Sequence, residues 1–461
     1  MPAENALFTT GFLHMRKILT FYHSVDKFNG NLNLFKEKAM KSILKKLISF
    51  ALVIVLLMSA LPASAAEARL SAESKNAAPF VFVHGFGGWG QYDELSATSN
   101  YWGTGSEEID AVGILNSSGY RAYAASVGPV SSAWDRACEL YAQLTGTVVD
   151  YGEAHSKECN HERFGKSFVG KPLMGENWDL SEPINLVGHS FGSATSRLLV
   201  SLLAFGDEAE IAATGNETSP LFTGGHSDAV HSVTTLSGVH NGTQIANMIY
   251  DFAPSMYIFS FFINVMPCFG VTFPMGDINL AHFGLTPKSG EKASISFKNI
   301  NNFVKAEDNA GYDLTLRGSR ELNEKIKMSP DTYYYSYSGY VTEKNRFGFQ
   351  ENTSGCAPIF KGICAVISLS KGRTFDGVKM TDEWAANDGL VPLASAKYPL
   401  CNSGEAISYE QAVKNGDAVA PGAWYYFEPM YGIDHGDYCY TDSTLPGGFI
   451  GFYLKLAETA A

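Results

Sequence analysis

Short apolar runs bounded by glycine, proline or polar residues recur along the chain, with helix-spaced segments between several of them. Bounded runs of this kind are typical of buried strands. The runs that predict strands are residues 79–83, 184–188, 230–236, 332–337 and 424–427, and the segments that predict helices are 134–144, 195–203 and 320–327. Strands that alternate with helices favour an α/β fold with a mostly parallel central sheet flanked by helices.

The N-terminal region combines a basic segment with an apolar one. Lysines follow Met40, residues 47–61 form an apolar run, and Ala-Ser-Ala at 63–65 provides small residues for cleavage. This order is typical of a secretory signal peptide, with a membrane anchor as the alternative, although the run is shorter than the roughly 20 residues of a spanning helix. We therefore expect residues 1–65 to be an N-terminal extension and signal peptide, and residues 66–461 to be one exported α/β domain.

The charge balance narrows the choice of partners. The net charge is −13; residues 1–65 contribute +5, which leaves −18 for the remainder. An acidic body argues against a nucleic-acid partner and favours a neutral or apolar one. No later stretch is long and apolar enough to predict stable insertion into a membrane.

All seven cysteines follow the predicted signal peptide, where export permits disulfides. The odd number leaves at least one thiol unpaired. Cys356 and Cys364 are close enough in sequence to close a local loop.

One long segment combines many large apolar side chains with almost no charge. Residues 245–273 are crowded with Phe, Met, Ile and Tyr. Such a segment is either a buried core helix or a helical lid whose apolar underside covers a site. We assign a lid to about residues 244–285.

The sequence Gly188-His189-Ser190-Phe191-Gly192 fits the pattern G-x-S-x-G between a predicted strand and a predicted helix. That context is the one required for a nucleophile elbow, a sharp turn that presents a serine hydroxyl. A serine hydroxyl needs a base to accept its proton and an acid to orient the base. Ser190 is therefore the candidate nucleophile.

Candidates for the acid and the base lie downstream, in the chain order Ser, Asp/Glu, His that such elbows use. Asp388 lies beside a glycine turn, and Asp376 and Asp382 are rival acids. His435 follows an aromatic strand and is the last histidine of the chain, the preceding one being His282.

The reaction of such a serine creates an oxyanion, which two backbone N–H groups stabilise. One donor is the residue after the serine, Phe191. The other comes from the loop after the first predicted strand, where Phe86 lies in His-Gly-Phe-Gly-Gly.

Longer motifs carry a resemblance to a known family. The runs are VHGFGGWG (83–90), YWG (101–103), VGPVSSAWDRAC (127–138), VDYGEAH (149–155) and RFG (163–165). The chain from about Pro79 onward resembles the secreted bacterial lipases of the Geobacillus and Staphylococcus type. The resemblance implies an α/β-hydrolase fold, carboxylic ester hydrolysis with long-chain triacylglycerols as the usual substrates, and a Ser190–Asp388–His435 triad.

The resemblance also implies a structural zinc held by two histidines and two aspartates, in an insertion of about residues 129–180. The matching ligands are Asp135, His155 and His161. Ala281 stands where the family has its second aspartate, so Asp277 or His282 is the candidate for the fourth ligand. Two imidazoles with carboxylates suit zinc.

A calcium ion near the catalytic histidine is implied in the same way. The matching groups are Asp437, Asp442 and the carbonyl of Ser443. Oxygen ligands fit calcium, and a solvated acidic loop is the alternative.

The sequence thus predicts a secreted triacylglycerol lipase acting through an acyl-enzyme, on lipid at an oil–water or polymer interface. An esterase or polyester hydrolase that prefers short or polymeric esters is the alternative. A non-catalytic binder of hydrophobic surfaces on the same scaffold is a third hypothesis.

Overall fold

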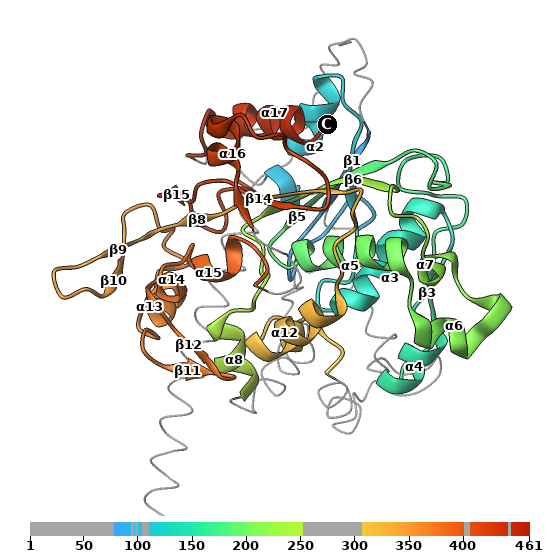
Figure 1. Cartoon of the computed structure of the whole chain (residues 1–461), viewed down its shortest axis with the longest axis horizontal. Helices are drawn as coiled ribbons and strands as arrows, with labels where there is room; N and C mark the ends of the chain where they lie inside the picture. Colours follow the sequence, from blue (N-terminus) through green and yellow to red (C-terminus); the bar gives the residue numbers. More distant parts are fainter. Residues whose placement is uncertain are drawn as a thin grey trace, which may run out of the picture. The chain divides into compact units, whose positions relative to one another are not determined.

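A seven-stranded parallel sheet forms the centre of the computed structural model (Figure 1). The strands, in the order β13-β14-β7-β6-β5-β1-β2 across the sheet, are β13 (Ile407–Ser408), β14 (Trp424–Tyr426), β7 (Tyr333–Tyr337), β6 (Val230–Leu236), β5 (Ile184–His189), β1 (Phe80–Val83) and β2 (Ala122–Ala125). Every neighbouring pair is parallel. The predicted α/β fold with a mostly parallel sheet is confirmed.

The structure describes residues 78–93, 96, 100–103, 110–251, 307–400, 406–440 and 444–461. The predicted signal region and the predicted lid beyond Asp251 lie outside these residues. The same holds for Asp277, His282, Asp442 and Ser443. Among the described helices, none is long and apolar enough to cross a membrane.

The two faces of the sheet carry separate apolar cores, because successive side chains of a strand point to opposite faces. On β1, Val81 and Val83 belong to the core beneath one face, whereas Phe80 and Phe82 belong to the core on the other. All four side chains are fully buried. A strand buried on both faces reads as a continuous apolar run, which is why the sequence predicted β1 and β5 directly.

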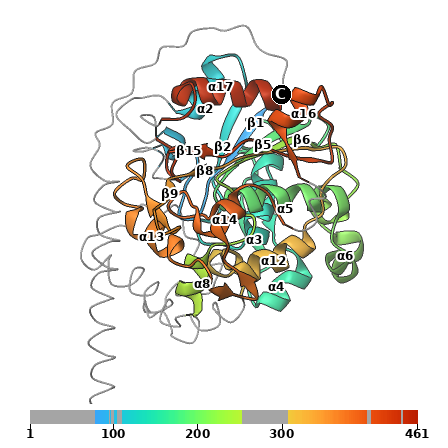
Figure 2. The same ribbon diagram turned by 60° about the vertical axis from the view of Figure 1, so that its left-hand side comes forward.

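Helices cover both faces (Figures 1 and 2). The helices are α2 (Ala111–Ser117), α3 (Ala133–Thr145), α4 (Glu153–Cys159), α5 (Gly192–Phe205), α6 (Glu208–Thr214), α7 (Pro220–Thr223), α8 (Gln244–Asp251), α11 (Ala310–Asp313), α12 (Leu316–Lys325), α13 (Lys361–Ser368), α14 (Asp382–Ala385), α15 (Leu393–Ala396), α16 (Tyr409–Asn415) and α17 (Gly448–Ala460). Figure 2 shows α2 and α17 on one side of the strands and α3 and α5 on the other.

The caps of α3 explain where this helix begins and ends. The Ser132 side chain accepts a hydrogen bond from the N–H of Asp135, 3.2 Å away, as an N-cap does. Gly146 ends the helix in the left-handed conformation that glycine adopts without a steric penalty. The predicted helix at 134–144 is confirmed within about one residue at each end.

Four two-stranded ribbons and two 3₁₀ turns complete the described secondary structure. They are β3 (Val148–Asp150) with β4 (Phe164–Ser167), β8 (Gly339–Tyr340) with β15 (Met430–Tyr431), β9 (Thr342–Lys344) with β10 (Gln350–Asn352), β11 (Thr374–Phe375) with β12 (Val378–Lys379), and the turns Tyr101–Gly103 and Gly215–Glu217. The β3–β4 ribbon brackets α4, inside the segment predicted as the insertion.

The five cysteines among the described residues are all free thiols: Cys138, Cys159, Cys356, Cys364 and Cys439. The predicted closure between Cys356 and Cys364 is therefore wrong for this structure. Both side chains are nevertheless buried in one small apolar cluster with Val341.

Candidate active site and metal cluster

Ser190 occupies the turn between β5 and α5. Its φ of +55° lies in the left-handed region, where a residue other than glycine stores strain of about 1–3 kcal/mol. The turn is held by the bond from the Ser190 N–H to the Leu236 carbonyl (2.9 Å). Position 192 requires glycine, because a Cβ there would lie 2.0 Å from the Val83 carbonyl oxygen. These features are those of a nucleophile elbow.

His435 and Asp388 form a buried pair. The two atoms His435 Nδ1 and Asp388 Oδ2 lie 2.8 Å apart, and the His435 N–H donates to the Asp388 backbone carbonyl at 2.8 Å. The other carboxylate oxygen, Oδ1, accepts from the N–H groups of Leu390 (3.0 Å) and Val391 (2.7 Å). Burial alone would raise the pKa of Asp388, but the facing His435 and these N–H groups outweigh burial and hold the pKa below its usual value. Asp388 is therefore an ionised acceptor for an imidazole N–H.

The rival acids predicted from the sequence lie elsewhere. Asp382 is half exposed and forms ion pairs with Lys344 and Lys371 at the surface. Asp376 accepts hydrogen bonds from the side chain of Asn247 and the backbone of Arg317. Among the three candidate acids, the structure brings Asp388 to His435.

His189 connects the elbow to the loop that carries His435. Its Nε2–H donates to the His435 carbonyl at 3.0 Å, which leaves Nδ1 as the acceptor for the Tyr101 hydroxyl at 2.7 Å. The same hydroxyl accepts from the Gly85 N–H at 3.0 Å. Burial, together with the nearby His435, lowers the pKa of His189 to about 3. The neutral ring therefore ties the loop after β1, the elbow and the loop of His435 together.

Arg136 and His84 hold the loop after β1. The fully buried guanidinium donates to the carbonyls of His84 and Gly128 and to the Thr195 hydroxyl. The His84 Nδ1–H donates to the Gly85 carbonyl at 2.9 Å, and its Nε2 accepts from Val127. Burial and the charge of Arg136 lower the pKa of His84 to about 3, while burial lowers the pKa of Arg136 to about 10. At neutral pH this loop is fixed by one cation and one neutral imidazole.

The two predicted oxyanion donors are Phe86, in the loop after β1, and Phe191, in the turn between β5 and α5. The backbone N–H groups of Phe86 and Phe191 make no hydrogen bond to another described residue. Phe191 precedes α5, whose N-terminal end favours negative charge. The Phe191 ring is buried beneath the Arg136 guanidinium (5.0 Å to the centroid), whereas the Phe86 ring is 47% exposed. Both amides are thus available to an acceptor from outside the protein.

A second polar cluster lies apart from this site. His155 Nε2 lies 3.4 Å from Asp135 Oδ1 and 3.5 Å from Asp308 Oδ2. His161 Nε2 lies 3.9 Å from the same oxygen of Asp135 and 3.2 Å from that of Asp308. The structure thus brings together the three predicted ligands Asp135, His155 and His161, and adds Asp308.

The dimensions of this cluster are those of a metal site. Four donors about 2.0 Å from a tetrahedral ion lie about 3.3 Å from one another, close to the distances found here. His155 Nε2 and Asp308 Oδ2 are buried and make no hydrogen bond with the described residues. Buried polar atoms without such bonds are costly unless another group, such as a cation, satisfies them. The cluster is a candidate metal centre.

Asp308 was missed by the sequence analysis. It precedes Asn309, the N-cap of α11, and its position is fixed where α11 docks on the start of α3. The Ala310 N–H donates to the Val130 carbonyl (3.0 Å), and the Ala133 N–H donates to Asp313 Oδ2 (2.7 Å). The sequence feature that could have indicated Asp308 is an aspartate directly before the N-cap of a helix, in the segment that follows the predicted lid.

Only part of the predicted calcium site is described. Asp437 Oδ2 accepts from the backbone N–H of Asp434 at 2.7 Å, within the loop of His435. Asp442 and Ser443 lie outside the described residues.

The fold and the elbow define the class of protein: an α/β-hydrolase. More narrowly, the chain belongs to the family described as "Lipase-like, C-terminal domain", whose sequence model matches residues 76–446. The predicted resemblance to the Staphylococcus lipases is confirmed by the relatives. Lipase 2 of Staphylococcus aureus (strain MRSA252) is 33% identical over 390 residues, which cover 84% of this chain and 52% of the relative. The lipase of Staphylococcus hyicus is 33% identical over 377 residues, with 80% and 54% covered. The chain thus spans about half the length of these relatives.

Solved structures are similar over most of both chains. The Staphylococcus hyicus lipase matches with a TM-score of 0.71 and 31% identity, covering 85% of this chain and 97% of that one. EstA from Clostridium botulinum matches with a TM-score of 0.68 and 32% identity, covering 86% and 92%. Lipase 1 from Pelosinus fermentans matches with a TM-score of 0.65 and 34% identity, covering 84% and 98%.

Proposed function

We propose that this chain is a secreted serine carboxylic ester hydrolase of the triacylglycerol lipase type. The observation that supports this most directly is the buried 2.8 Å pair of His435 and Asp388, which His189 links to the elbow of Ser190. The relatives named as lipases support the same class of activity. The acidic body of the chain agrees with an uncharged ester substrate.

In the proposed reaction, Ser190 Oγ attacks the ester carbonyl carbon while His435 Nε2 accepts the hydroxyl proton. Asp388 orients the imidazole and stabilises the imidazolium. The N–H groups of Phe86 and Phe191 stabilise the oxyanion, a contribution of about 3 kcal/mol for each donor. His435 then returns the proton to the departing alcohol, which leaves an acyl group on Ser190. Water attacks this ester with His435 again as base, and the fatty acid leaves.

The test is the replacement Ser190→Ala, with Ser193→Ala as the matched control. Ser193 is buried one turn further along and donates to the Gly188 carbonyl, so its replacement removes one buried hydrogen bond and leaves the Ser190 hydroxyl in place. We expect S190A to abolish turnover of a p-nitrophenyl ester and labelling by an organophosphate while its circular dichroism stays unchanged. Turnover by S190A close to that of the wild type would contradict the assignment.

The substrate class follows from a comparison of triolein emulsion, short soluble esters and a polyester film. A lipase with a lid over residues 244–285 increases its activity once an interface forms. If the rate per ester bond is the same below and above the solubility limit of the substrate, the assignments of a lipase and of a lid are contradicted. That result would favour the esterase alternative.

For the metal centre we propose zinc as the resident ion, held by Asp135, His155, His161 and Asp308. Two neutral imidazoles and two carboxylates form a nitrogen and oxygen set that suits zinc. Zinc here would be structural, since its four protein ligands leave no open position for substrate. Metal analysis of the purified full chain tests this assignment, and about one equivalent of zinc is expected. A preparation saturated with zinc that retains none after gel filtration would contradict it.

For the loop of His435 we propose a calcium site built from Asp437, Asp442 and the Ser443 carbonyl. An ion there would hold the loop that positions the proposed base. Asp437→Asn is expected to remove any stabilisation by added calcium, and an unchanged response would contradict this site. Export, by a signal peptide that ends near residue 65, is tested by N-terminal sequencing of the mature enzyme.

A further inference from the structure

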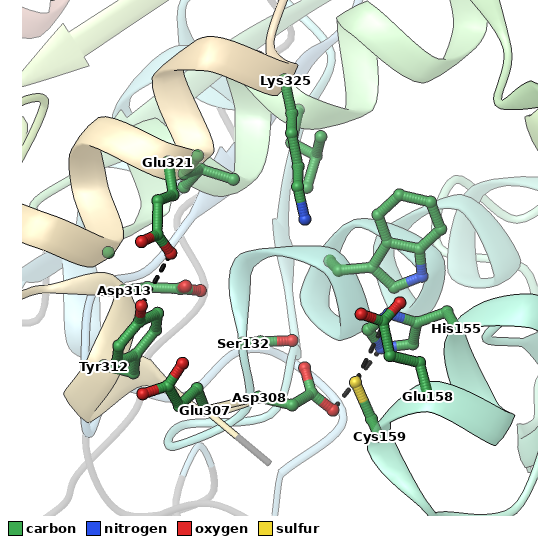
Figure 3. A pocket seen from close by; sticks show the side chains of 14 residues that line it. Ser132, His155, Glu158, Cys159, Glu307, Asp308, Tyr312, Asp313, Glu321 and Lys325 are labelled. Carbon is green, nitrogen blue, oxygen red and sulfur yellow. Dashed lines mark hydrogen bonds and ion pairs between the residues drawn. The ribbon is translucent and has the colours of Figure 1, made fainter. Parts of the chain in front are cut away.

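A cysteine that is not one of the proposed zinc ligands lies beside the metal cluster. Cys159 follows His155 by four residues, so both side chains lie on the same face of α4. Its sulfur is 3.8 Å from His155 Nδ1, the ring nitrogen that faces away from Asp135 and Asp308. Figure 3 shows the sulfur pointing to the space beside Asp308. The donor atoms of Cys159, His155, His161 and Asp308 all lie within 4.8 Å of one another.

An independent observation indicates a cation here. Asp308 Oδ2 and His155 Nε2 are buried and make no hydrogen bond with the described residues, although both are directed into the cluster. A cation between them satisfies both atoms and compensates for the burial of the carboxylate.

The tautomer of His155 follows from this arrangement. A ring nitrogen that binds a metal carries no proton, so with Nε2 on the ion the proton of neutral His155 is on Nδ1. The buried Nδ1–H then needs a hydrogen-bond acceptor, and the sulfur of Cys159 lies next to it. In most metal sites a carboxylate or a backbone carbonyl has this role. The face of the ring is held as well, because Trp134 stacks on it at 5.0 Å between centroids.

We propose that Cys159 is a positioning residue of the metal centre: its sulfur accepts the Nδ1–H of His155 and so holds Nε2 toward the ion. The proposal rests on the metal centre described above. Because a thiol is chemically reactive where a carboxylate is not, metal affinity in this protein becomes sensitive to modification of one side chain.

The surroundings of the thiol make a selective reagent available. Cys159 is partly exposed and lines a cavity of about 220 Å³ whose other charged groups are mainly acidic (Figure 3). They are Glu158, Glu307, Asp308, Asp313 and Glu321, with Lys325 as the single lysine among the lining residues. Such a cavity attracts cations and repels anions. Neutral iodoacetamide should therefore modify Cys159 faster than anionic iodoacetate, after correction for their rates with a free thiol.

The main experiment measures zinc affinity of the full chain in competition with a chromophoric chelator. The variants are C159A, C159S and, as the control, K157Q, an exposed residue of the same helix that pairs with Glu153. Loss of an outer partner costs about 10- to 100-fold in metal affinity, so we expect that loss for C159A and for the iodoacetamide-treated wild type. C159S should recover part of the affinity, because a hydroxyl also accepts, and K157Q should bind like the wild type. A C159A affinity within twofold of the wild type would overturn the proposal.

Cobalt replacement separates the outer role from direct ligation. Thiolate bound to Co²⁺ gives an intense near-ultraviolet charge-transfer band. Because the proposed role leaves the sulfur of Cys159 off the metal, we expect both the wild type and C159A to lack this band. A strong band that C159A loses would make Cys159 a ligand and overturn the outer role. The melting temperatures of the metal-free proteins test for misfolding. If C159A and C159S melt at the temperature of the wild type, misfolding is excluded as the cause of the lost zinc affinity. A wild type that binds no zinc or cobalt would instead overturn the metal centre itself.

Discussion

The Nε2–H of His189, the residue before the elbow serine, donates to the backbone carbonyl of His435 at 3.0 Å. The ring centroids of these two histidines are 4.7 Å apart. The position of the proposed base therefore depends on the strand that carries the proposed nucleophile. This contact joins two segments that are far apart in the sequence.

We expect His189→Ala to lower kcat by about 10- to 100-fold with a much smaller change in KM, because a displacement of about 1 Å at a catalytic group costs that much. Steady-state kinetics with a soluble ester measure both constants. His226→Ala is the control, since His226 lies in a partly exposed loop before β6. An H189A enzyme with the kcat of H226A would show that the contact has no positioning role.

The carboxylate of Asp388 distinguishes the proposed triad from a chance turn. Replacing the acid of such a triad by its amide lowers kcat by about 10⁴-fold, because the amide holds the imidazole in the wrong tautomer. We expect that loss for Asp388→Asn. Asp382→Asn removes only exposed ion pairs with lysines and should leave kcat near that of the wild type. Equal kcat values for the two variants would contradict the assignment of the acid.

The buried guanidinium of Arg136 should matter more for stability than any exposed arginine. Arg136→Met leaves the carbonyls of His84 and Gly128 without their donor, and breaking a buried charged network costs about 3–5 kcal/mol. Arg121→Met removes an exposed pair with Glu182, worth at most about 1 kcal/mol. Denaturant unfolding measures both losses. Similar unfolding free energies for the two variants would be incompatible with this role of Arg136.

Removal of the proposed zinc should destabilise the fold more than it affects the chemistry. A ligand present at 100 times its Kd stabilises the native state by about 2.7 kcal/mol. We expect a chelator to remove that amount from the wild type and nothing from Asp308→Ala. Asp179→Asn, an exposed position in the same region, serves as the control and should respond like the wild type. A chelator effect in D308A equal to that in the wild type would exclude Asp308 as a ligand.

The buried histidines predict a loss of stability in mild acid. The pKa values of His84 and His189 are about 3 in the folded protein against 6.5 in the unfolded chain. Below pH 6.5 the unfolded state therefore binds more protons, and each histidine costs up to about 1.4 kcal/mol per pH unit as the pH falls. Burial raises the pKa of Asp313 to about 7, so this carboxyl group stabilises the fold as the pH falls and offsets one histidine.

We therefore expect these three groups to lower the unfolding free energy by about 1.4 kcal/mol per pH unit from about pH 6 to about pH 4. Denaturant titrations of the metal-free chain at constant ionic strength measure the total slope, to which the fully buried His240 adds, because burial lowers its pKa as well. Asp313→Asn removes the offset and should steepen the slope by about 1.4 kcal/mol per pH unit, since an amide oxygen still accepts the Ala133 N–H. A slope in D313N equal to or below that of the wild type would contradict the assignment.

The elements that were predicted from the sequence are those with a strong local pattern. The strand before Ser190 and the helix after it are apolar and bounded by glycine, so β5, α5 and the turn between them were readable. The edge strands β2 and β13 were not, because β2 is alanine-rich and β13 has two residues, too few for a period to show.

The groups that were not predicted depend on contacts across long separations. Tyr101 reaches His189 across 88 positions, and Arg136 reaches Thr195 across 59. Spacing along the chain carries no information about such contacts. Asp308 was missed for the same reason, because its partners lie about 150 positions earlier, before the segment assigned as the lid.

The metal cluster also has a consequence for the unfolded chain. An ion that joins His155 to Asp308 closes a loop of about 150 residues. In the chain-entropy model, a covalent cross-link of that span stabilises the native state by about 5 kcal/mol, because it restricts the unfolded chain. The described cysteines form no disulfide. For the proposed exported hydrolase, such an ion would be a reversible cross-link, present while free metal is available and released when a competitor removes it.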